Sequence, residues 1–185
     1  AVLLGMGSLG AGRLNAGSDL DLILIYDAAG VEQSDGRRPL PTRSYFARLT
    51  QAMVTALSAQ TAEGRLYEVD VRLRPSGRAG AVATSIDGWR DYQQTEAWTW
   101  EHQALLHARA VAGSPSLRAE FERIRLEVIT GAVRRATLAT EVRSMRERMR
   151  RELSRAKAGE FDMKQDPGGI ADIEFLAQYW ALQWA

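Results

Sequence analysis

The short connection between the first two predicted strands is the feature that most limits how this chain can fold. Residues 1–5 (AVLLG) and 20–26 (LDLILIY) are aliphatic and bounded by glycine or aspartate, which is typical of buried strands. The connection starts within residues 5–10 (GMGSLG), a match to the G-x-G-x-x-G pattern of dinucleotide-binding proteins. That fold needs a crossover helix of about 10 residues, and residues 11–18 contain two glycines instead. The sequence therefore argues against a dinucleotide-binding fold.

The rest of the chain changes between helical and extended patterns. Apolar side chains recur at helical spacing within residues 43–62, which predicts an amphipathic helix. Residues 65–75 (RLYEVDVRLRP) alternate apolar with charged side chains, which predicts a third strand with one charged face. Thr84 and Asp87 resemble a helix cap and open an aromatic-rich segment that runs towards Val111. Further helices are predicted near 116–130, near 138–157 and from about residue 170.

A candidate domain boundary lies at residues 113–115 (Gly-Ser-Pro). We therefore expect an α/β catalytic domain over residues 1–113 and a helical domain over residues 114–185, truncated at its C-terminus. The chain opens on an apolar strand and closes inside an apolar helix, so both ends look like cuts through a larger protein.

The charges of the chain nearly cancel, with a formal net charge of +1. Binding to nucleic acid or to an anionic membrane relies on a basic excess, so we expect neither partner. The absence of cysteine excludes a disulfide framework, a thiolate zinc site and a cysteine nucleophile. The apolar runs are shorter than a membrane span, and the first residues do not form a signal peptide. We therefore expect a soluble, cytoplasmic protein.

Carboxylates gather at the start of the second predicted strand and on the third. Asp19 and Asp21 flank Leu20, and alternation in a strand places both carboxylates on the same face. Two carboxylates this close repel each other unless a cation lies between them, and Mg²⁺ takes hard oxygen ligands of this kind. Asp70, on the charged face of the third predicted strand, adds the carboxylate needed to bridge a second metal ion. The pattern predicts a site for two Mg²⁺ ions, with Mn²⁺ as a substitute, that assists an attacking oxygen and a leaving pyrophosphate.

Residues suited to holding phosphate lie beside these carboxylates. Gly7 lets the backbone approach a phosphate, and the amides and hydroxyl of Gly7 and Ser8 can contact its oxygens. Arg72 and Arg74 share the charged face of the third predicted strand and can form bidentate hydrogen bonds to phosphate. Ser18, directly before the first carboxylate, completes this set of candidates. The residues predict nucleotidyl transfer from a nucleoside triphosphate.

Each of these motifs alone has a simpler explanation. An Asp-x-Asp pair is usually a solvated strand end, a Gly-Ser pair is usually a turn, and two arginines on a strand usually form an exposed face. Their joint order along the chain is far less common by chance. We therefore prefer the metal site over a collection of unrelated surface residues.

A second candidate anion site lies around residues 161–169 (FDMKQDPGG). Gly168-Gly169 leads into a predicted helix N-terminus, where backbone amides attract anions, and Lys164 adds a positive charge. The alternative is a solvated loop followed by a helix whose first turn carries the acids Asp172 and Glu174. Lys164 is therefore a further candidate nucleotide-binding residue.

Several segments of the chain resemble one known family. Residues 7–27 (GSLGAGRLNAGSDLDLILIYD) and 66–77 (LYEVDVRLRPSG) resemble the polymerase-β-type nucleotidyltransferases, and among them the glutamine synthetase adenylyltransferase family. The resemblance continues through residues 92–111 and 161–179, and so covers nearly the whole chain. LYEVDVRLRPSG and QTEAWTWEHQAL are similar to the C-terminal, adenylylating half of these two-headed enzymes. The implied fold is α/β (α+β), with a small mixed sheet flanked by helices and followed by part of an α-helical bundle.

The resemblance implies ATP-dependent transfer of AMP to a tyrosine hydroxyl of glutamine synthetase, with release of pyrophosphate. In the intact enzyme the PII signalling protein and glutamine would set the direction. By position, the metal ligands would be Asp19, Asp21 and Asp70, and the triphosphate contacts Gly7 and Ser8. Asp70 would also position or deprotonate the tyrosine hydroxyl. Many members carry lysine at the position of Ser8, which changes how phosphate charge is neutralised there.

Two other functions stay open at this point. The deadenylylating half of the family would use the same carboxylates with phosphate as the nucleophile on AMP-tyrosine. A non-catalytic module would bind glutamine synthetase or PII through its helices and carry the carboxylates without activity.

Overall fold

The computed structural model describes residues 1–157 and 159–185 and divides into two compact units. The sheet unit consists of Ala1–Ala97 with His107–Leu126, and the helical unit of Trp98–Leu106 with Glu127–Ala185. These units interleave along the chain, whereas the sequence analysis places a single boundary after residue 113. That boundary stays a prediction about domains.

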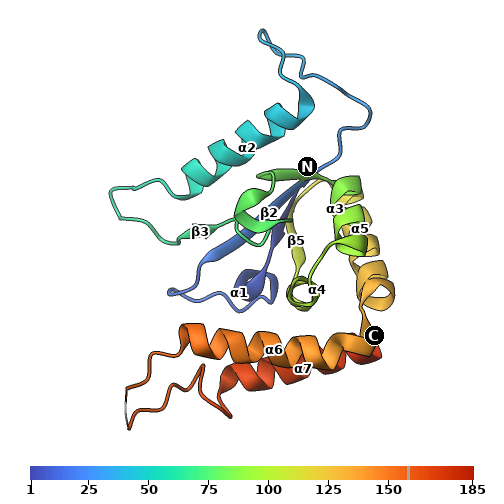
Figure 1. Ribbon diagram of the computed structural model, residues 1–185. Helices are drawn as coiled ribbons and strands as arrows, with labels where there is room; N and C mark the ends of the chain where they lie inside the picture. Colours follow the sequence, from blue (N-terminus) through green and yellow to red (C-terminus); the bar gives the residue numbers. More distant parts are fainter. Residues whose placement is uncertain (158) are drawn as a thin grey trace. The chain divides into compact units, whose positions relative to one another are not determined.

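A five-stranded mixed sheet forms the centre of the sheet unit (Figure 1). Its strands are β1 (Val2–Gly5), β2 (Leu20–Tyr26), β3 (Val69–Asp70), β4 (Ala83–Ser85) and β5 (Arg109–Gly113). β1 pairs antiparallel with both β2 and β5, while β3 and β4 pair parallel with β2. Because an antiparallel pair needs no crossover helix, the short connection after β1 suffices. The predicted fold class is confirmed.

The predicted extent of the third strand is wrong. Only Val69 and Asp70 are paired as a strand, and the chain turns directly afterwards. The Asp70 carboxylate accepts the backbone N–H of Arg72 at 2.7 Å, and this local bond replaces a ladder hydrogen bond. The alternation that placed Arg72 and Arg74 on one strand face with Asp70 therefore does not apply. Sequence reasoning also missed β4 and β5, whose short runs of small residues carry no strong strand pattern.

Helices pack around the sheet within this unit. They are α1 (Gly7–Gly10), α2 (Thr42–Leu57), α3 (Ile86–Thr95) and α5 (Pro115–Glu127), with a 3₁₀ turn at Gly77–Ala79. The α2 ring of Phe46 stacks on Tyr26 of β2, with centroids 4.2 Å apart. Trp89 of α3 and Phe121 of α5 are fully buried against each other, with centroids 5.2 Å apart. The cap of α3 is Ser85, which accepts the Gly88 N–H at 3.2 Å, rather than the predicted Thr84.

The helical unit is built from α4 (Thr99–Leu105), a π-helical turn (Val128–Ala132), α6 (Arg135–Leu153) and α7 (Ile170–Trp184). In Figure 1, α6 and α7 run side by side. Leu138 of α6 and Leu182 of α7 are completely buried. The predicted helices near 138–157 and from residue 170 are confirmed. None of the helices in the described part of the chain combines the length and apolar character that crossing a bilayer requires.

The three glycines of the G-x-G-x-x-G match have separate structural causes. A Cβ on Gly10 would lie 1.8 Å from the carbonyl oxygen of His107, and one on Gly5 would lie 2.8 Å from Cγ of Leu9. Gly7 has a φ of +50°, a conformation that favours glycine. The motif is thus explained by close packing of α1 against its neighbours, and the rejection of a dinucleotide-binding fold is confirmed by the antiparallel β1–β2 pair.

Replacing Gly10 with alanine is expected to lower the free energy of unfolding by about 2–3 kcal/mol, because the new methyl group meets backbone atoms that cannot rotate away. Gly36→Ala is the matched control, since a Cβ there meets nothing within 4 Å. Urea unfolding of both variants tests this. Equal midpoints for the two would contradict the packing argument.

Candidate functional site

Two of the predicted metal ligands are partners across neighbouring strands. Asp21 of β2 and Asp70 of β3 are in direct register in a parallel pair, so their side chains lie on the same face of the sheet. The Leu20 N–H donates to the Glu68 carbonyl at 2.8 Å and continues this pairing up to Asp19. The structure therefore brings the strand ends that carry all three predicted carboxylates together.

The electrostatics of Asp21 show how close these carboxylates lie. Burial raises the pKa of Asp21 above its ordinary value, and the charges of Asp70 and Asp19 raise it further. The guanidinium of Arg72 acts in the opposite direction on the same pKa. Asp21 is therefore in the electric field of two further acids, which disfavours its ionisation unless a cation is present.

Arg72 places a cation beside these acids at the protein surface. Its backbone N–H donates to Asp70 Oδ1 at 2.7 Å. Its guanidinium donates to Asp70 Oδ2 through Nε at 2.7 Å and also through Nη2. The Arg72 side chain stays 60% exposed, whereas that of Asp70 is 16% exposed. The ion pair thus joins an exposed guanidinium to a largely buried carboxylate.

Gly7 lies directly against the carboxylate of Asp21. A Cβ at this position would lie 2.6 Å from Asp21 Oδ2, so any larger residue would displace the acid as well as strain the backbone. Ser8 is exposed at the start of α1, whose first amides have no partner within the helix. Ser18 has a local role, because its Oγ accepts the Asn15 N–H at 3.1 Å in the turn before Asp19.

Arg74 is placed differently from Arg72. It is buried, and its Nη1 donates to the Val71 carbonyl at 2.6 Å while Nε approaches the Gly80 carbonyl at 3.5 Å. These bonds hold the turn that follows β3. A phosphate-binding role for Arg74 stays a prediction, and its buried position gives that role no support.

The set of three carboxylates fits hard divalent cations by its chemistry, since Mg²⁺ and Mn²⁺ bind carboxylate oxygens. The pKa of Asp21 is raised by burial first and by the charges of Asp70 and Asp19 second, and a bound cation would offset both effects. Among the described residues, no three acidic or histidine side chains converge on one point that could hold a metal ion. The Asp70 carboxylate is paired with Arg72 instead.

Comparison with known proteins bears directly on this site. Residues 1–124 match the family described as Glutamate-ammonia ligase adenylyltransferase. The chain belongs to this family. The match includes every predicted site residue of the sheet unit and ends before Lys164. The family resemblance seen in the sequence is thereby confirmed.

Two curated relatives from Xanthomonas campestris pv. campestris, strain B100 and a second strain, are each 52% identical to the chain over 177 residues. Both carry the name bifunctional glutamine synthetase adenylyltransferase/adenylyl-removing enzyme. The aligned segment covers 95% of this chain and 19% of each relative. The chain therefore spans about one fifth of the length of these family members.

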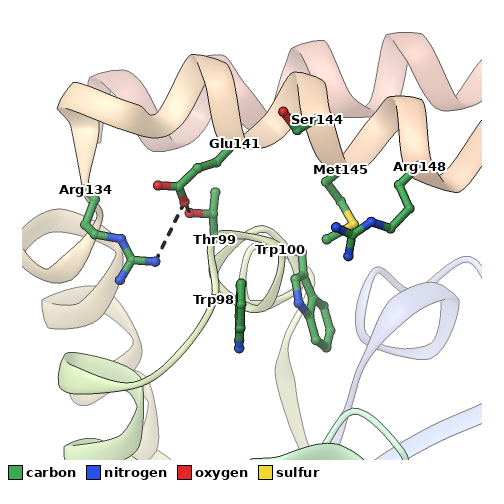
Figure 2. Close-up of a pocket in the computed structure, with 8 residues that line it drawn as sticks. All are labelled: Trp98, Thr99, Trp100, Arg134, Glu141, Ser144, Met145 and Arg148. Atoms are coloured by element: carbon green, nitrogen blue, oxygen red, sulfur yellow. Dashed lines mark hydrogen bonds and ion pairs between the residues drawn. The ribbon is translucent and has the colours of Figure 1, made fainter.

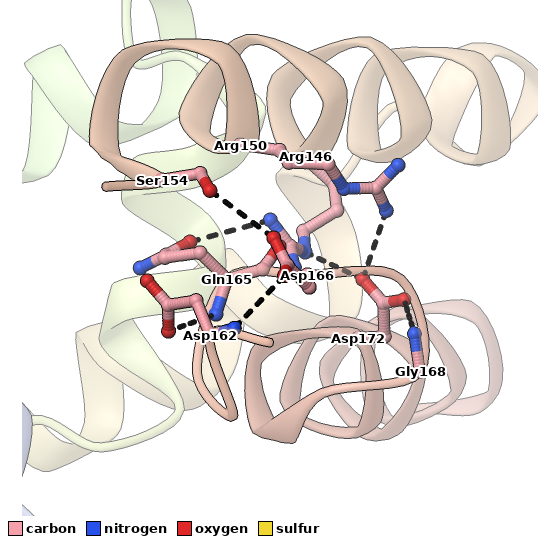
Figure 3. Close-up of polar contacts among 8 residues, drawn as sticks. All are labelled: Arg146, Arg150, Ser154, Asp162, Gln165, Asp166, Gly168 and Asp172. Atoms are coloured by element: carbon pink, nitrogen blue, oxygen red, sulfur yellow. Dashed lines mark hydrogen bonds and ion pairs between the residues drawn. The ribbon is translucent and has the colours of Figure 1, made fainter. Parts of the chain in front are cut away.

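Lys164 lies on an exposed loop of the helical unit that a buried arginine fastens to α6 (Figure 3). Arg146 donates from Nε to Asp172 Oδ1 at 2.7 Å and from Nη2 to the Gln165 carbonyl at 2.8 Å. Asp166 continues the network, because its carboxylate accepts Ser154 Oγ at 3.1 Å. The loop conformation thus depends on charged groups buried beneath it.

The start of α7 has little capacity left for an anion. The Ile170 and Ala171 N–H groups donate to the carbonyls of Met163 and Lys164 at 2.9 and 3.1 Å. The Gly168 N–H donates to Asp172 Oδ2 at 2.7 Å, and this bond is the largest cause of the lowered pKa of Asp172. The predicted anion site at these amides is therefore not supported. A role for Lys164 rests on its side chain alone.

Sequence reasoning also missed a cavity of about 460 Å³ in the helical unit, between α4 and α6 (Figure 2). Its lining residues are Trp98, Thr99, Trp100, Arg134, Glu141, Ser144, Met145 and Arg148. Glu141 fastens α4 to α6, because it accepts hydrogen bonds from Thr137 and Thr99 that lower its pKa. Trp98 is 66% exposed at the mouth, although aromatic side chains at helical spacing usually indicate core.

Replacing Arg146 with methionine is expected to lower the free energy of unfolding by about 2–3 kcal/mol, because it removes the buried donor to the Gln165 carbonyl and one of the donors to Asp172, which keeps those of Arg150 and Gly168. Arg143→Met, an exposed change on the same helix, is the control. Urea unfolding and hydrogen exchange at the Gly168 amide report the effect. Exchange rates at the Gly168 amide that match those of the control would contradict this role of Arg146.

Because the pKa of Asp21 is raised, Asp21→Asn is expected to increase the free energy of unfolding in metal-free buffer by an amount that depends on pH. A carboxyl whose pKa is higher in the folded than in the unfolded protein lowers stability once it ionises. The loss of stability grows as the pH rises from the unfolded pKa through the folded pKa. Asp21→Asn should raise the unfolding free energy at pH 7, and the gain should shrink as the pH falls towards about 3.9. Urea titrations between pH 4.5 and 8, with exposed Asp35→Asn as control, measure it. A gain independent of pH would contradict this cause.

Proposed function

We propose that the chain carries a catalytic site that transfers AMP from ATP to a tyrosine hydroxyl of glutamine synthetase and releases pyrophosphate. The observation that carries this proposal is the register of Asp21 with Asp70 on neighbouring parallel strands, with Asp19 one residue before β2. Family membership and the names of the curated relatives support the same chemistry. Within the family, we assign the chain to the C-terminal, adenylylating half.

The three carboxylates Asp19, Asp21 and Asp70 would hold Mg²⁺, in two ions, with Mn²⁺ as a substitute. When bound, such ions neutralise triphosphate charge and favour both the attacking oxygen and the leaving pyrophosphate. Burial of Asp21 and its acidic neighbours make a cation the natural complement of this cluster.

The residues of the chain itself bind and orient the substrates. Gly7 lets the backbone pass close to Asp21, and the exposed Ser8 with the backbone amides beside it would bind phosphate oxygens. Ser18 and Arg72 are the further phosphate contacts beside the carboxylates. Arg74, which holds the turn after β3, is a further proposed contact, and Lys164 of the helical unit is proposed on its own as a nucleotide-binding residue.

Asp70 is proposed to position the tyrosine hydroxyl or to deprotonate it. Its Oδ1 is held by the Arg72 amide, so the plane of the carboxylate is set by the backbone. The ordinary pKa of tyrosine is about 10, so removal of the proton at neutral pH requires such assistance.

The wider setting follows from family membership. Glutamine synthetase is the proposed protein substrate, PII the proposed regulatory partner of the intact enzyme, and the cytoplasm the proposed location. We propose no nucleic acid or membrane partner, in keeping with the net charge of +1. In domain terms we propose a catalytic domain over residues 1–113 and a truncated helical domain over residues 114–185.

A second candidate function is the reverse chemistry on modified glutamine synthetase. The curated relatives are named for both adenylyl transfer and adenylyl removal, and the same carboxylates would serve phosphate as the nucleophile. A non-catalytic module that only binds glutamine synthetase or PII is the third possibility.

Incubation of the chain with α-labelled ATP, Mg²⁺ and glutamine synthetase separates these functions. Label on the tyrosine of glutamine synthetase is the expected result. Phosphate-dependent release of label from adenylylated glutamine synthetase, without incorporation, would replace the proposal with the removing activity. Binding without either reaction would replace it with the non-catalytic module.

The double variant Asp19→Asn with Asp21→Asn should lose at least about a hundredfold in the rate of AMP transfer, because metal assistance contributes several kcal/mol. Asp35→Asn with Asp91→Asn changes net charge equally at exposed positions and should keep the rate. Circular dichroism confirms the fold of both. Transfer at the wild-type rate by the first variant would rule out these carboxylates as the metal ligands.

A further inference from the structure

Arg72 binds Asp70, one of the proposed metal ligands. Its guanidinium is therefore already engaged and is not available to phosphate. Its guanidinium covers Asp70 Oδ2 with two donors, Nε at 2.7 Å and Nη2. The other carboxylate oxygen is bound by the Arg72 amide at 2.7 Å. In this state neither oxygen of Asp70 is open to a metal ion.

The two bonds to Asp70 differ in how easily they can be exchanged. The bond from the backbone amide to Oδ1 is part of the turn after β3 and fixes the orientation of the carboxylate. The bond from the guanidinium to Oδ2 comes from a side chain that is 60% exposed. The guanidinium can therefore leave for solvent without opening the fold, while the amide bond keeps the carboxylate oriented.

We propose that Arg72 is a built-in counter-ion that occupies the Asp70 arm of the metal site until a divalent cation displaces it. The inference rests on the metal site of the proposed function and adds that Arg72 and the divalent cation compete for Asp70. Displacement exchanges the singly charged guanidinium for a doubly charged metal ion beside Asp70, so the acidic cluster is never left without a cation. The released guanidinium then lies two residues from Asp70 and becomes free to bind triphosphate oxygens.

The competition gives Arg72 two effects of opposite sign. Without nucleotide, removal of the guanidinium relieves the metal ion of a competitor, so metal binding becomes tighter. With nucleotide, removal takes away a phosphate contact, so binding of the metal–ATP complex becomes weaker. A residue that only supports the fold would weaken both.

Direct binding of Mn²⁺ to the full chain tests the inference. The free ion is counted by electron paramagnetic resonance for the wild type, Arg72→Gln and the control Arg37→Gln, which removes an equal charge from an exposed loop. We expect Arg72→Gln to bind Mn²⁺ about three- to fivefold more tightly than the wild type, because an exposed ion pair competes only weakly with the metal ion. Arg37→Gln should bind as the wild type does.

Equal or weaker Mn²⁺ binding by Arg72→Gln than by Arg37→Gln would overturn the counter-ion. Arg72→Lys distinguishes charge from geometry: it should bind Mn²⁺ with an affinity between those of the wild type and Arg72→Gln, because it keeps the charge but not the fork that reaches Oδ2. An affinity for Arg72→Lys equal to that of Arg72→Gln would contradict a charge-based competition.

The same titration keeps this inference separate from the metal site itself. If Asp19→Asn with Asp21→Asn binds Mn²⁺ as tightly as the wild type, the metal site of the proposed function fails. If that double variant loses Mn²⁺ while Arg72→Gln gains none, the site stands and only the counter-ion fails. A second titration with an ATP analogue present should show weaker binding by Arg72→Gln, and unchanged nucleotide binding would remove the phosphate contact that the inference assigns to the released side chain.

Discussion

The antiparallel pairing of β1 with β2 is the constraint on which the geometry of the site depends. At the end of β1 the Met6 N–H donates to the Asp21 carbonyl at 2.9 Å, and the chain then turns with Gly7 against the carboxylate of the same aspartate. The other edge of β2 pairs with β3 and places Asp70 beside Asp21. One buried strand thus aligns the Gly7-Ser8 turn with the acids, and its aliphatic side chains anchor both in the core.

The cost of this arrangement is a gathering of like charges at the edge of the sheet. Burial and two neighbouring acids raise the pKa of Asp21, which means that the ionised cluster opposes folding when no cation is near. Arg72 reduces that cost by binding Asp70. The helical unit uses charge differently. There the buried Arg146 meets Asp172 and a backbone carbonyl, so each charged group is satisfied inside the protein and serves the conformation of the loop.

Sequence reasoning succeeded where a pattern depends on local rules. The aliphatic runs of β1 and β2 and the apolar periodicity of the long helices were predicted within a few residues, because burial of one face dictates those patterns. It failed where the neighbouring strand determines whether a segment is extended. β4 and β5 are strands because the edges of β2 and β1 offer them unpaired backbone groups, and their own residues give little sign of it. Alternation in residues 65–75 gave the opposite error, since the Asp70 side chain ends the strand.

The order of residues alone determined the chemistry available to this protein: two carboxylates at the start of one strand, a third on a later strand, and a Gly-Ser turn before them. That order also sufficed to identify the family. Only the tertiary structure decided which of these groups are engaged. It binds Arg72 to Asp70, buries Arg74 under a turn, and closes the start of α7 with its own carbonyls and Asp172. The physical reason is that hydrogen bonding and burial depend on groups brought together from distant segments, which no local pattern encodes.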